Sequence, residues 1–432
     1  MTAQDNTRRK NLILFAILSV LIWFFVLEGI LEAQGLFWAR YIEYLIVFAS
    51  APVFLVRLIC RSTRKAEILK LTDPILVFAL LFAFAGVVSW ARCRVQPLSL
   101  TLLSMLEHYR FWLGLYLFYV IASEFDLASA AKKLALQIRL LCVLIIGTTI
   151  ADMIFHIWPR QEYRHGIGSI QIFFGHPSVL AIVSVFLIGC LLLLTVYVRF
   201  LWPWIFAMFL PLCMTLRVRM LGFAFCLAVI FLLLVLKKHY LRLPHILIAL
   251  VGLLGIGGYR IWTMYFYRTA WRNARTVMTV TSLQVARDHV PFGAGFGTYG
   301  SRIAQIFYSP LYFDYGLFRY LGLDPLWPSF ACDTFWPMLL GETGFIGLAL
   351  YIVMVVMLCI KVRRTRFGEH RFYVTALVLL LFLLLESTSA LAFSGSGIAM
   401  ITLPLGMALY FGTKSPSAGS GVEEYENEER RA

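Results

Sequence analysis

Long apolar stretches separated by short polar connections recur along almost the whole chain. A helix needs about 20 apolar residues to cross the hydrocarbon core of a bilayer, and windows of that length predict about twelve spanning helices. These windows fall near residues 11–33, 40–60, 72–91, 108–124, 135–157, 178–198, 200–215, 219–236, 245–263, 336–360, 372–392 and 396–413. The pattern therefore predicts an all-α polytopic membrane protein.

One interruption of this pattern is long enough to form a folded unit. Residues 1–263 hold the first nine predicted helices, residues 264–335 form a large loop, and residues 336–413 hold the last three helices. The loop is rich in aromatic residues, arginine and glycine, so we expect it to be ordered and functional. Residues 414–432 are rich in serine and glycine and then acidic, and we expect a disordered tail there.

Composition excludes a soluble protein, because 61% of the residues are hydrophobic and only 14% are charged, against about 25% charged in soluble domains. The net charge of +15 alone would suggest a nucleic-acid partner. Basic clusters, however, fall in loops that the predicted spans place on one side of the membrane, as the positive-inside rule requires. These clusters lie near residues 61–65, 132–133, 237–238 and 361–364. We therefore expect both termini in the cytoplasm, the large loop outside and no nucleic-acid partner.

The eight cysteines form no CxxC pair and have no metal-ligand spacing with histidine, so the sequence predicts no metal site. Most of the cysteines fall in apolar spans, where a free thiol behaves as a small hydrophobe. Cys93 and Cys332 both fall outside in the predicted topology, which makes a disulfide between them possible.

Two arginines, Arg217 and Arg219, stand between two apolar spans at the predicted outer face. Guanidinium groups beside the hydrocarbon core are costly unless they are paired or face water, and their planar donors suit phosphate oxygens. At a spacing of i, i+2 the two do not share a helix face, so only one is expected to point inward. Snorkelling of both to lipid head groups is the structural alternative.

A second group of arginines opens the large loop. Arg268, Arg272 and Arg275 have the spacing i, i+4 and i+7, so one helix would align all three on one face. Tyr267 and Trp271 lie among them and are suited to stacking on sugar rings or to lying at the membrane interface. An interfacial amphipathic helix held by lipid phosphates is the alternative. Both interpretations imply an anionic partner.

Two further outer segments carry binding candidates. Residues 291–301 contain glycine at alternate positions followed by Tyr299, a composition that permits tight turns and close approach to a ligand. No βαβ pattern precedes this turn, so we reject a dinucleotide site, and a purely structural turn remains the alternative. A shorter outer segment, residues 159–177, ends at His176, and we include Tyr299 and His176 among the substrate-binding candidates.

Carboxylates mark the point where the loop re-enters the membrane. Asp333 is expected at the outer mouth of the helix, with Glu342 about 13 Å deeper if the segment is helical. A carboxylate at that depth is costly, so Glu342 should be protonated or paired with an arginine. Glu386 in the next span carries the same ambiguity.

In order and topology these residues resemble the family of O-antigen ligases and O-antigen or exopolysaccharide polymerases. That family has about a dozen helices, an outer arginine before a mid-chain helix, and a late periplasmic loop with an arginine-bearing helix. A glycine-rich turn and a Leu-x-Glu-x-Gly-x-x-Gly re-entry follow. The matches here are Arg217 or Arg219, then Arg275, then residues 291–300, then residues 341–347. The resemblance covers residues from about 160 to 360.

One departure separates the branches of this family. Its ligases have a histidine nine residues before the re-entry glutamate, where this chain has Asp333. The replacement favours the polymerase branch, which this chain also resembles at residues 297–301 and 309–312. A ligase remains the alternative within the family, and a transporter of lipid-linked sugars is the alternative of another class.

The resemblance implies metal-independent inverting glycosyl transfer from an undecaprenyl-diphosphate-linked glycan to a sugar hydroxyl, at the periplasmic face of a bacterial inner membrane. Arg217, Arg219 and Arg275 would bind the diphosphate, and Asp333 would accept the proton of the hydroxyl or orient it. Expected substrate-binding residues are Arg268, Arg272, Tyr299, His176 and Glu342. No cofactor is implied; membrane lipid, a chain-length regulator and a flippase are the expected partners.

Overall fold

A computed structural model describes most of the chain: residues 3–36, Tyr44, and residues 74–160, 162–164, 166–235, 273–388, 390–395 and 397–413. The predicted spans near residues 40–60 and 245–263 and the predicted tail at 414–432 lie outside the described residues.

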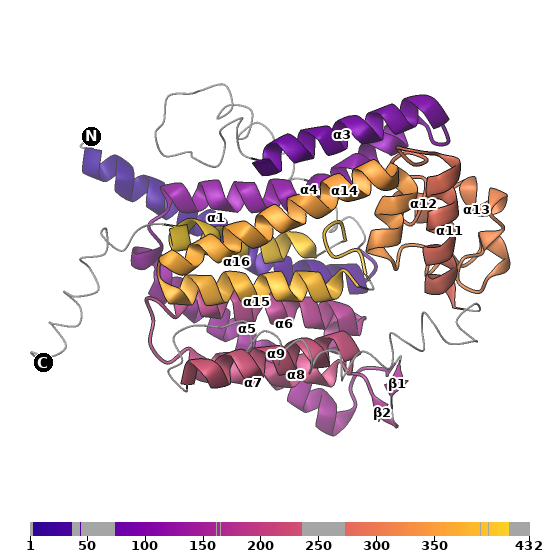
Figure 1. The fold of residues 1–432 in the computed structure, drawn as a ribbon. Helices are drawn as coiled ribbons and strands as arrows, with labels where there is room; N and C mark the ends of the chain where they lie inside the picture. The colour runs from indigo at the N-terminus through magenta and orange to yellow at the C-terminus, as the bar shows by residue number, and fades with distance from the viewer. Residues whose placement is uncertain are drawn as a thin grey trace, which may run out of the picture.

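Nine long helices form the body of the molecule and run side by side along one direction (Figure 1). They are α1 (Ala3–Ala33), α3 (Pro74–Cys93), α4 (Leu98–Glu124), α5 (Leu127–Phe155), α6 (Pro177–Leu194), α9 (Val218–Val235), α14 (Phe335–Arg364), α15 (His370–Glu386) and α16 (Ile398–Thr413), counted within the described residues. Helix α16 packs against α4, α6 and α15, and nearly all of its residues are buried. This helix therefore lies at the centre of the core.

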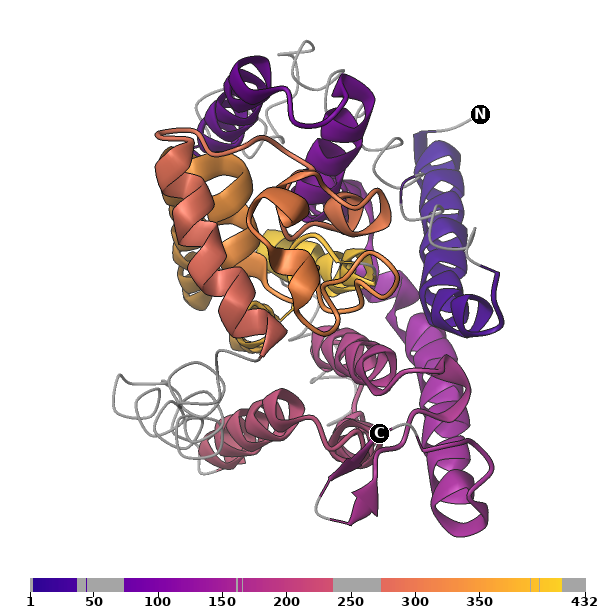
Figure 2. The ribbon, with the colours of Figure 1, turned by 90° about the vertical axis from the view of Figure 1, so that its right-hand side faces the viewer.

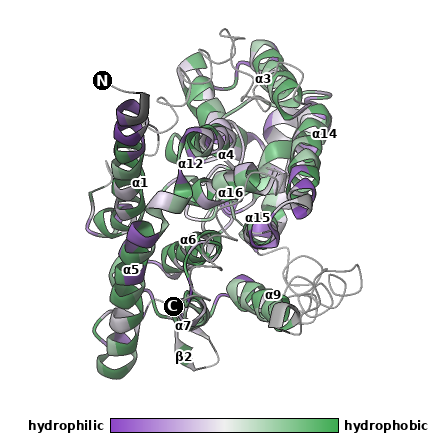
Figure 3. Cartoon of the chain, turned by 90° about the vertical axis from the view of Figure 1, so that its left-hand side faces the viewer, coloured by the Kyte–Doolittle hydropathy of each residue, from purple (hydrophilic) through white to green (hydrophobic). Residues whose placement is uncertain are grey.

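Hydrophobic residues dominate these helices along their length (Figure 3). Five helices in the described part of the chain, α1, α3, α5, α6 and α14, are long and apolar enough to cross a membrane. Most of the residues on the apolar window of α3 and of α5 are not buried inside the protein, as expected for helices whose outer faces contact lipid. The sequence-based prediction of a helical membrane protein is thus supported, while the count of twelve spans and the sidedness stay predictions.

One predicted span is wrong as a single helix. Residues 200–215 form two short helices, α7 (Trp202–Ala207) and α8 (Phe209–Met214), which meet at Met208. Pro211 has no N–H to donate toward the carbonyl of Ala207, and a proline ring crowds that carbonyl. The two pieces together are shorter than a membrane crossing requires.

One end of the bundle, here called the loop end, carries the folded part of the large loop (Figure 2). Its elements are α11 (Ala274–Asp288), α12 (Arg302–Ile306), α13 (Leu311–Asp314) and a 3-10 turn, Leu317–Arg319. A separate small core that includes Met278, Tyr299, Tyr312 and Leu323 holds them together. A hairpin of β1 (Tyr163–Arg164) and β2 (Ile167–Gly168) lies at the same end of the bundle.

The glycine-rich turn docks into a kink of α14. Gly344, inside α14, has a φ of 63° and a ψ of −165°, and Gly293 in the turn has a φ of 73°. The backbones meet so closely that a Cβ on Gly293 would lie 2.4 Å from the Gly344 nitrogen. The N–H groups of Ala294 and Gly295 donate to the carbonyls of Gly341 (3.0 Å) and Glu342 (2.8 Å). The turn therefore serves to fasten the loop to the membrane helix.

Gly293→Ala should destabilise the protein. The left-handed φ alone costs an alanine about 1–2 kcal/mol, and the contact with the Gly344 backbone adds strain that no side-chain movement can relieve. Thermal unfolding in detergent measures the loss. The matched control is Gly147→Ala in α5, where nothing lies within 4 Å of the new methyl group, so that variant should be as stable as the parent or up to about 1 kcal/mol more stable. Equal stability of the two variants would contradict the docking role.

Candidate functional site

Three of the arginines proposed from the sequence lie at the loop end, and each is paired with a carboxylate. Arg217 Nη2 lies 2.7 Å from Glu162 Oε1, and Arg219 Nη1 lies 3.0 Å from Glu386 Oε1. Arg275 Nη2 lies 2.8 Å from Asp333 Oδ2, with 22% and 29% of these two side chains exposed. A guanidinium has five N–H groups, so each arginine keeps donors beyond the one that its carboxylate uses.

Arg217 and Arg219 both reach this site, which corrects the expectation that only one of them points inward. That expectation assumed that the two share a helix. Leu216 instead has a left-handed φ of 50°, and α9 begins at Val218. Arg217 therefore precedes the helix and Arg219 lies in its first turn, so the helical spacing rule does not apply to the pair.

His176 contacts Arg217 and lies within electrostatic range of Asp333. Its Nε2 lies 3.2 Å from Arg217 Nη2, and its Nδ1 accepts the N–H of Ser178 at 3.2 Å, which caps α6. Desolvation, followed by the positive charge of Arg217, lowers the pKa of His176, while Glu162 and Asp333 act in the opposite direction. The side chain remains accessible to solvent, so the charges around it, Asp333 included, converge on a reachable imidazole whose lowered pKa favours the neutral form.

Four helices begin at this cluster. Helix α6 follows His176, α9 follows Arg217, α11 begins one residue before Arg275, and α14 begins two residues after Asp333. The N-terminus of a helix carries a partial positive charge and unpaired N–H groups. The backbone thus adds to the positive potential of the arginines, and the cluster is suited to an anion with several oxygen atoms.

A short segment between α5 and α6 holds Glu162 in place. Arg160 forms an ion pair with the buried Asp152 of α5, and Asp152 also accepts the N–H of Trp158 at 3.0 Å. Farther along, the Ile170 N–H donates to the carbonyl of Met214 at 2.9 Å. The hairpin that carries Glu162 is therefore tied to α5 and to the end of α8.

The predicted three-arginine helix is wrong at Asn273. Asn273 has an extended backbone (φ −89°, ψ 124°), and its side chain accepts the N–H of Arg275, so α11 begins at Ala274. A helix capped at that point does not run back through residue 273. Arg268 and Arg272 lie outside the described residues.

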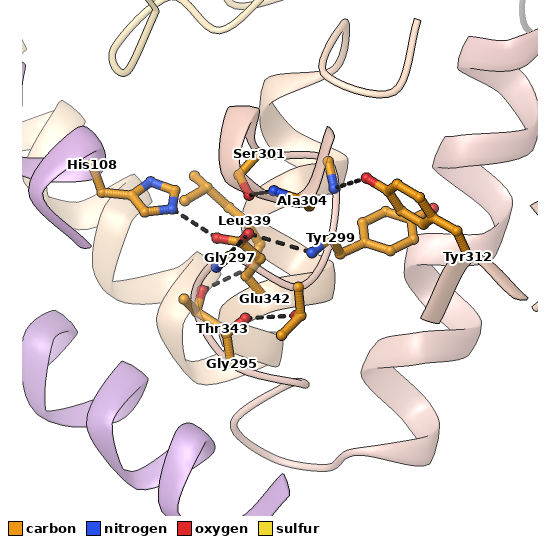
Figure 4. A network of polar contacts seen from close by, with 12 residues as sticks. His108, Gly295, Gly297, Tyr299, Ser301, Ala304, Tyr312, Leu339, Glu342 and Thr343 are labelled. Carbon is orange, nitrogen blue, oxygen red and sulfur yellow. Dashed lines mark hydrogen bonds and ion pairs between the residues drawn. The ribbon is translucent and has the colours of Figure 1, made fainter. Parts of the chain in front are cut away.

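Tyr299 and Glu342 are fully buried, and we therefore remove them from the substrate-binding candidates. Of the two alternatives expected for Glu342, a protonated carboxyl or an arginine partner, the arginine partner is wrong. Its Oε2 lies 2.8 Å from His108 Nε2, and its Oε1 accepts the N–H groups of Gly297 (2.9 Å) and Tyr299 (3.3 Å), as Figure 4 shows. The Tyr299 hydroxyl donates to the carbonyl of Met278 at 2.5 Å. Glu342 thus binds the glycine-rich turn, and Tyr299, within that turn, binds the backbone of α11.

Sequence reasoning missed a buried polar group in α4. Glu107, His108 and Arg110 occupy one helical turn, and each is at most 6% exposed. The Tyr44 hydroxyl donates to Glu107 at 3.1 Å and accepts from Arg110 at 3.0 Å. The signal was present, because three ionisable residues at the start of the span predicted near residues 108–124 are costly and need partners.

The possible disulfide is not formed. Cys93 and Cys332 are both free, and the Cys332 thiol donates to Gln305 Oε1 at 3.2 Å. Burial raises the pKa of Cys332 to about 11, so this thiol stays protonated. Among the described residues, no group of three histidine, cysteine, aspartate or glutamate side chains is placed to hold a metal ion.

Comparison with known proteins assigns no function to the chain, so a proposal must rest on the sequence and on the geometry of the site. No family model matches the chain, and no curated protein is significantly similar to it.

Replacing Glu342 should show its structural role. Glu342→Ala leaves two buried N–H groups and His108 without their acceptor, which should cost about 3 kcal/mol or more. Glu342→Gln keeps one acceptor oxygen and should lose clearly less. Thermal unfolding in detergent checks both variants.

The control is Glu124→Ala, which removes the partly exposed ion pair with Lys10 and should change stability by no more than about 1 kcal/mol. A Glu342→Ala protein as stable as this control would refute the structural role of the contacts that Glu342 makes with His108 and the glycine-rich turn.

Proposed function

We propose that this protein polymerises lipid-diphosphate-linked oligosaccharide repeats into a surface polysaccharide, by metal-independent inverting glycosyl transfer at the loop end. The observation that carries the proposal is that Arg217, Arg219 and Asp333 all act electrostatically on His176, that Arg275 pairs with Asp333, and that helices apolar enough to lie in a membrane stand beside them. A substrate that joins a lipid to a diphosphate and a sugar matches those three features.

The diphosphate is the part that the arginines would bind. Guanidinium groups bind phosphate oxygens through paired N–H donors, and they remain charged at any physiological pH. The carboxylates offset part of this charge, so a diphosphate must share each guanidinium with its partner. The four helix N-termini supply further positive potential to the same place.

The imidazole of His176 adds a separate argument for an anion. A neutral imidazole has one donor and one acceptor nitrogen, and the Ser178 N–H already occupies Nδ1 as acceptor. The ring proton is then on Nε2, which faces another donor, Arg217 Nη2, at 3.2 Å. A phosphate oxygen between the two groups would accept from both and replace a repulsive contact with two hydrogen bonds.

Asp333 is the proposed base. The hydroxyl oxygen of the acceptor forms a bond to the anomeric carbon, while the bond from that carbon to the diphosphate breaks. The electron pair leaves with the diphosphate, whose growing charge the arginines stabilise, and the hydroxyl proton moves to Asp333.

The order of the motifs supports the polymerase assignment. The outer arginines, Arg275, the glycine-rich turn and the re-entry at residues 341–347 follow one another as in O-antigen ligases and polymerases, which the chain resembles. The aspartate in place of the ligase histidine favours polymerase over ligase. On this proposal the protein lies in a bacterial inner membrane with the loop end in the periplasm.

Purified protein with a lipid-diphosphate oligosaccharide should form longer lipid-linked chains. Asp333→Asn should slow the transfer by about 10²–10⁴-fold, as expected for loss of a general base. Arg275→Lys should slow it by about tenfold or more, because an ammonium cannot reproduce the paired donors. Sizing of the products over time measures both effects.

The matched control is Arg287→Lys, an exposed position at the far end of the same helix α11, which should keep the parent rate. Transfer of whole glycan to a lipid acceptor, without chain growth, would assign a ligase. Vesicle uptake of the lipid-linked sugar without any new glycosidic bond would assign a transporter. Full activity in Asp333→Asn and Arg275→Lys would refute the proposed site.

A further inference from the structure

Three apolar side chains between α13 and α14 project almost entirely out of the fold. Leu321 is 85% exposed, Leu326 is 95% exposed and Trp327 is 71% exposed. Large apolar side chains grouped on a protein surface mark a contact with another surface, because water penalises their exposure.

This exposure is built into an ordered segment. Asp324 Oδ1 accepts the N–H groups of Leu326 (3.2 Å) and Trp327 (2.9 Å). The N–H of Phe330 donates to the carbonyl of Gly322 at 2.9 Å. Leu323, between the exposed positions, is fully buried. The segment therefore loses conformational entropy in the folded state while its apolar side chains remain exposed.

The exposed group continues onto α12. Gln305 Nε2 donates to the carbonyl of Pro328 at 2.7 Å, which ties the segment to this helix. The next two residues, Ile306 and Phe307, are 57% and 52% exposed. Five exposed apolar side chains thus belong to two elements joined by a direct hydrogen bond.

Helix α4, on which this part of the loop packs, also has exposed apolar positions. Helix α12 packs on α4, and a Cβ on Gly297 would touch both Ile303 of α12 and Ser104 of α4. Leu98 and Leu102, in the first turns of α4, are 46% and 45% exposed. Exposed apolar positions therefore occur both in the loop and on the bundle helix against which α12 packs.

We propose that Leu321, Leu326 and Trp327 insert into the lipid leaflet at the loop end, at the boundary between head groups and acyl chains. Tryptophan favours that depth, because its ring is apolar and its N–H seeks polar partners. Within residues 320–330 the only charged side chain is Asp324, and the N–H groups of its own segment engage it. No charged group other than Asp324 opposes insertion in that stretch.

Insertion would fix the height of the neighbouring site. Asp333 follows Trp327 by six residues, so a segment anchored at the head groups keeps Asp333 and its partner Arg275 near the level of lipid phosphates. The anchoring depends only on the exposed apolar side chains, and it holds whether or not the proposed glycosyl transfer is correct.

Fluorine NMR of the full chain in lipid nanodiscs, with 5-fluorotryptophan in place of tryptophan, tests this directly. Trp327→Phe assigns the resonance of Trp327, and Trp112→Phe assigns an internal control that is 2% exposed. One sample contains a phospholipid with a nitroxide near the head-group end of its acyl chain, and another contains a water-soluble gadolinium chelate. The Trp327 resonance should lose intensity with the nitroxide lipid and keep it with the chelate, while Trp112 should respond to neither.

The opposite pattern at Trp327, loss with the chelate alone, would place the segment in water and overturn the proposal. A resonance protected from both agents would show that protein covers it, either a second copy or another partner, and would also overturn the proposal. Leu326→Asp should reduce the loss caused by the nitroxide lipid, whereas Leu326→Met, which keeps the apolar volume, should leave it unchanged.

Discussion

A charge beside the apolar interior of a membrane must be paired, and this constraint organises the chain at two depths. At the loop end, each of Arg217, Arg219 and Arg275 has a carboxylate partner. Deeper in the bundle, Glu342 is paired with His108 and two backbone N–H groups. The superficial pairs include partly exposed side chains, and in our proposal these arginines share their donors with a ligand. The deep group, Glu342 with His108, is buried and stabilises the fold.

A chain of direct contacts connects the buried Glu342 with the Arg275–Asp333 pair. Glu342 holds the glycine-rich turn, and the turn holds Tyr299, whose hydroxyl reaches the backbone of α11 at Met278. Helix α11 presents Arg275 to Asp333, which directly precedes α14, the helix that carries Glu342. The buried carboxylate is therefore part of the support that sets the distance between the exposed arginine and the proposed base.

The helical membrane architecture was predictable, because apolar windows of about 20 residues have few alternatives. The position of Asp333 at the mouth of an apolar helix followed from the same reasoning, whereas its nearness to arginines was expected only from the family resemblance. The partner of Glu342 did not, since His108 is 234 positions away and no local pattern connects the two. The expectations for Arg217 with Arg219 and for the three-arginine helix failed because helix boundaries at Val218 and Ala274 depend on single backbone angles that periodicity does not reveal.

The central claim is that the arginine cluster binds a lipid diphosphate beside Asp333. A structure of the protein in a nanodisc with a polyprenyl-diphosphate-linked sugar measures this most directly. The account predicts diphosphate oxygens within hydrogen-bond distance of Arg217, Arg219 and Arg275, with the anomeric carbon facing Asp333. A diphosphate bound elsewhere, with the three arginines still paired only to their carboxylates, would contradict it.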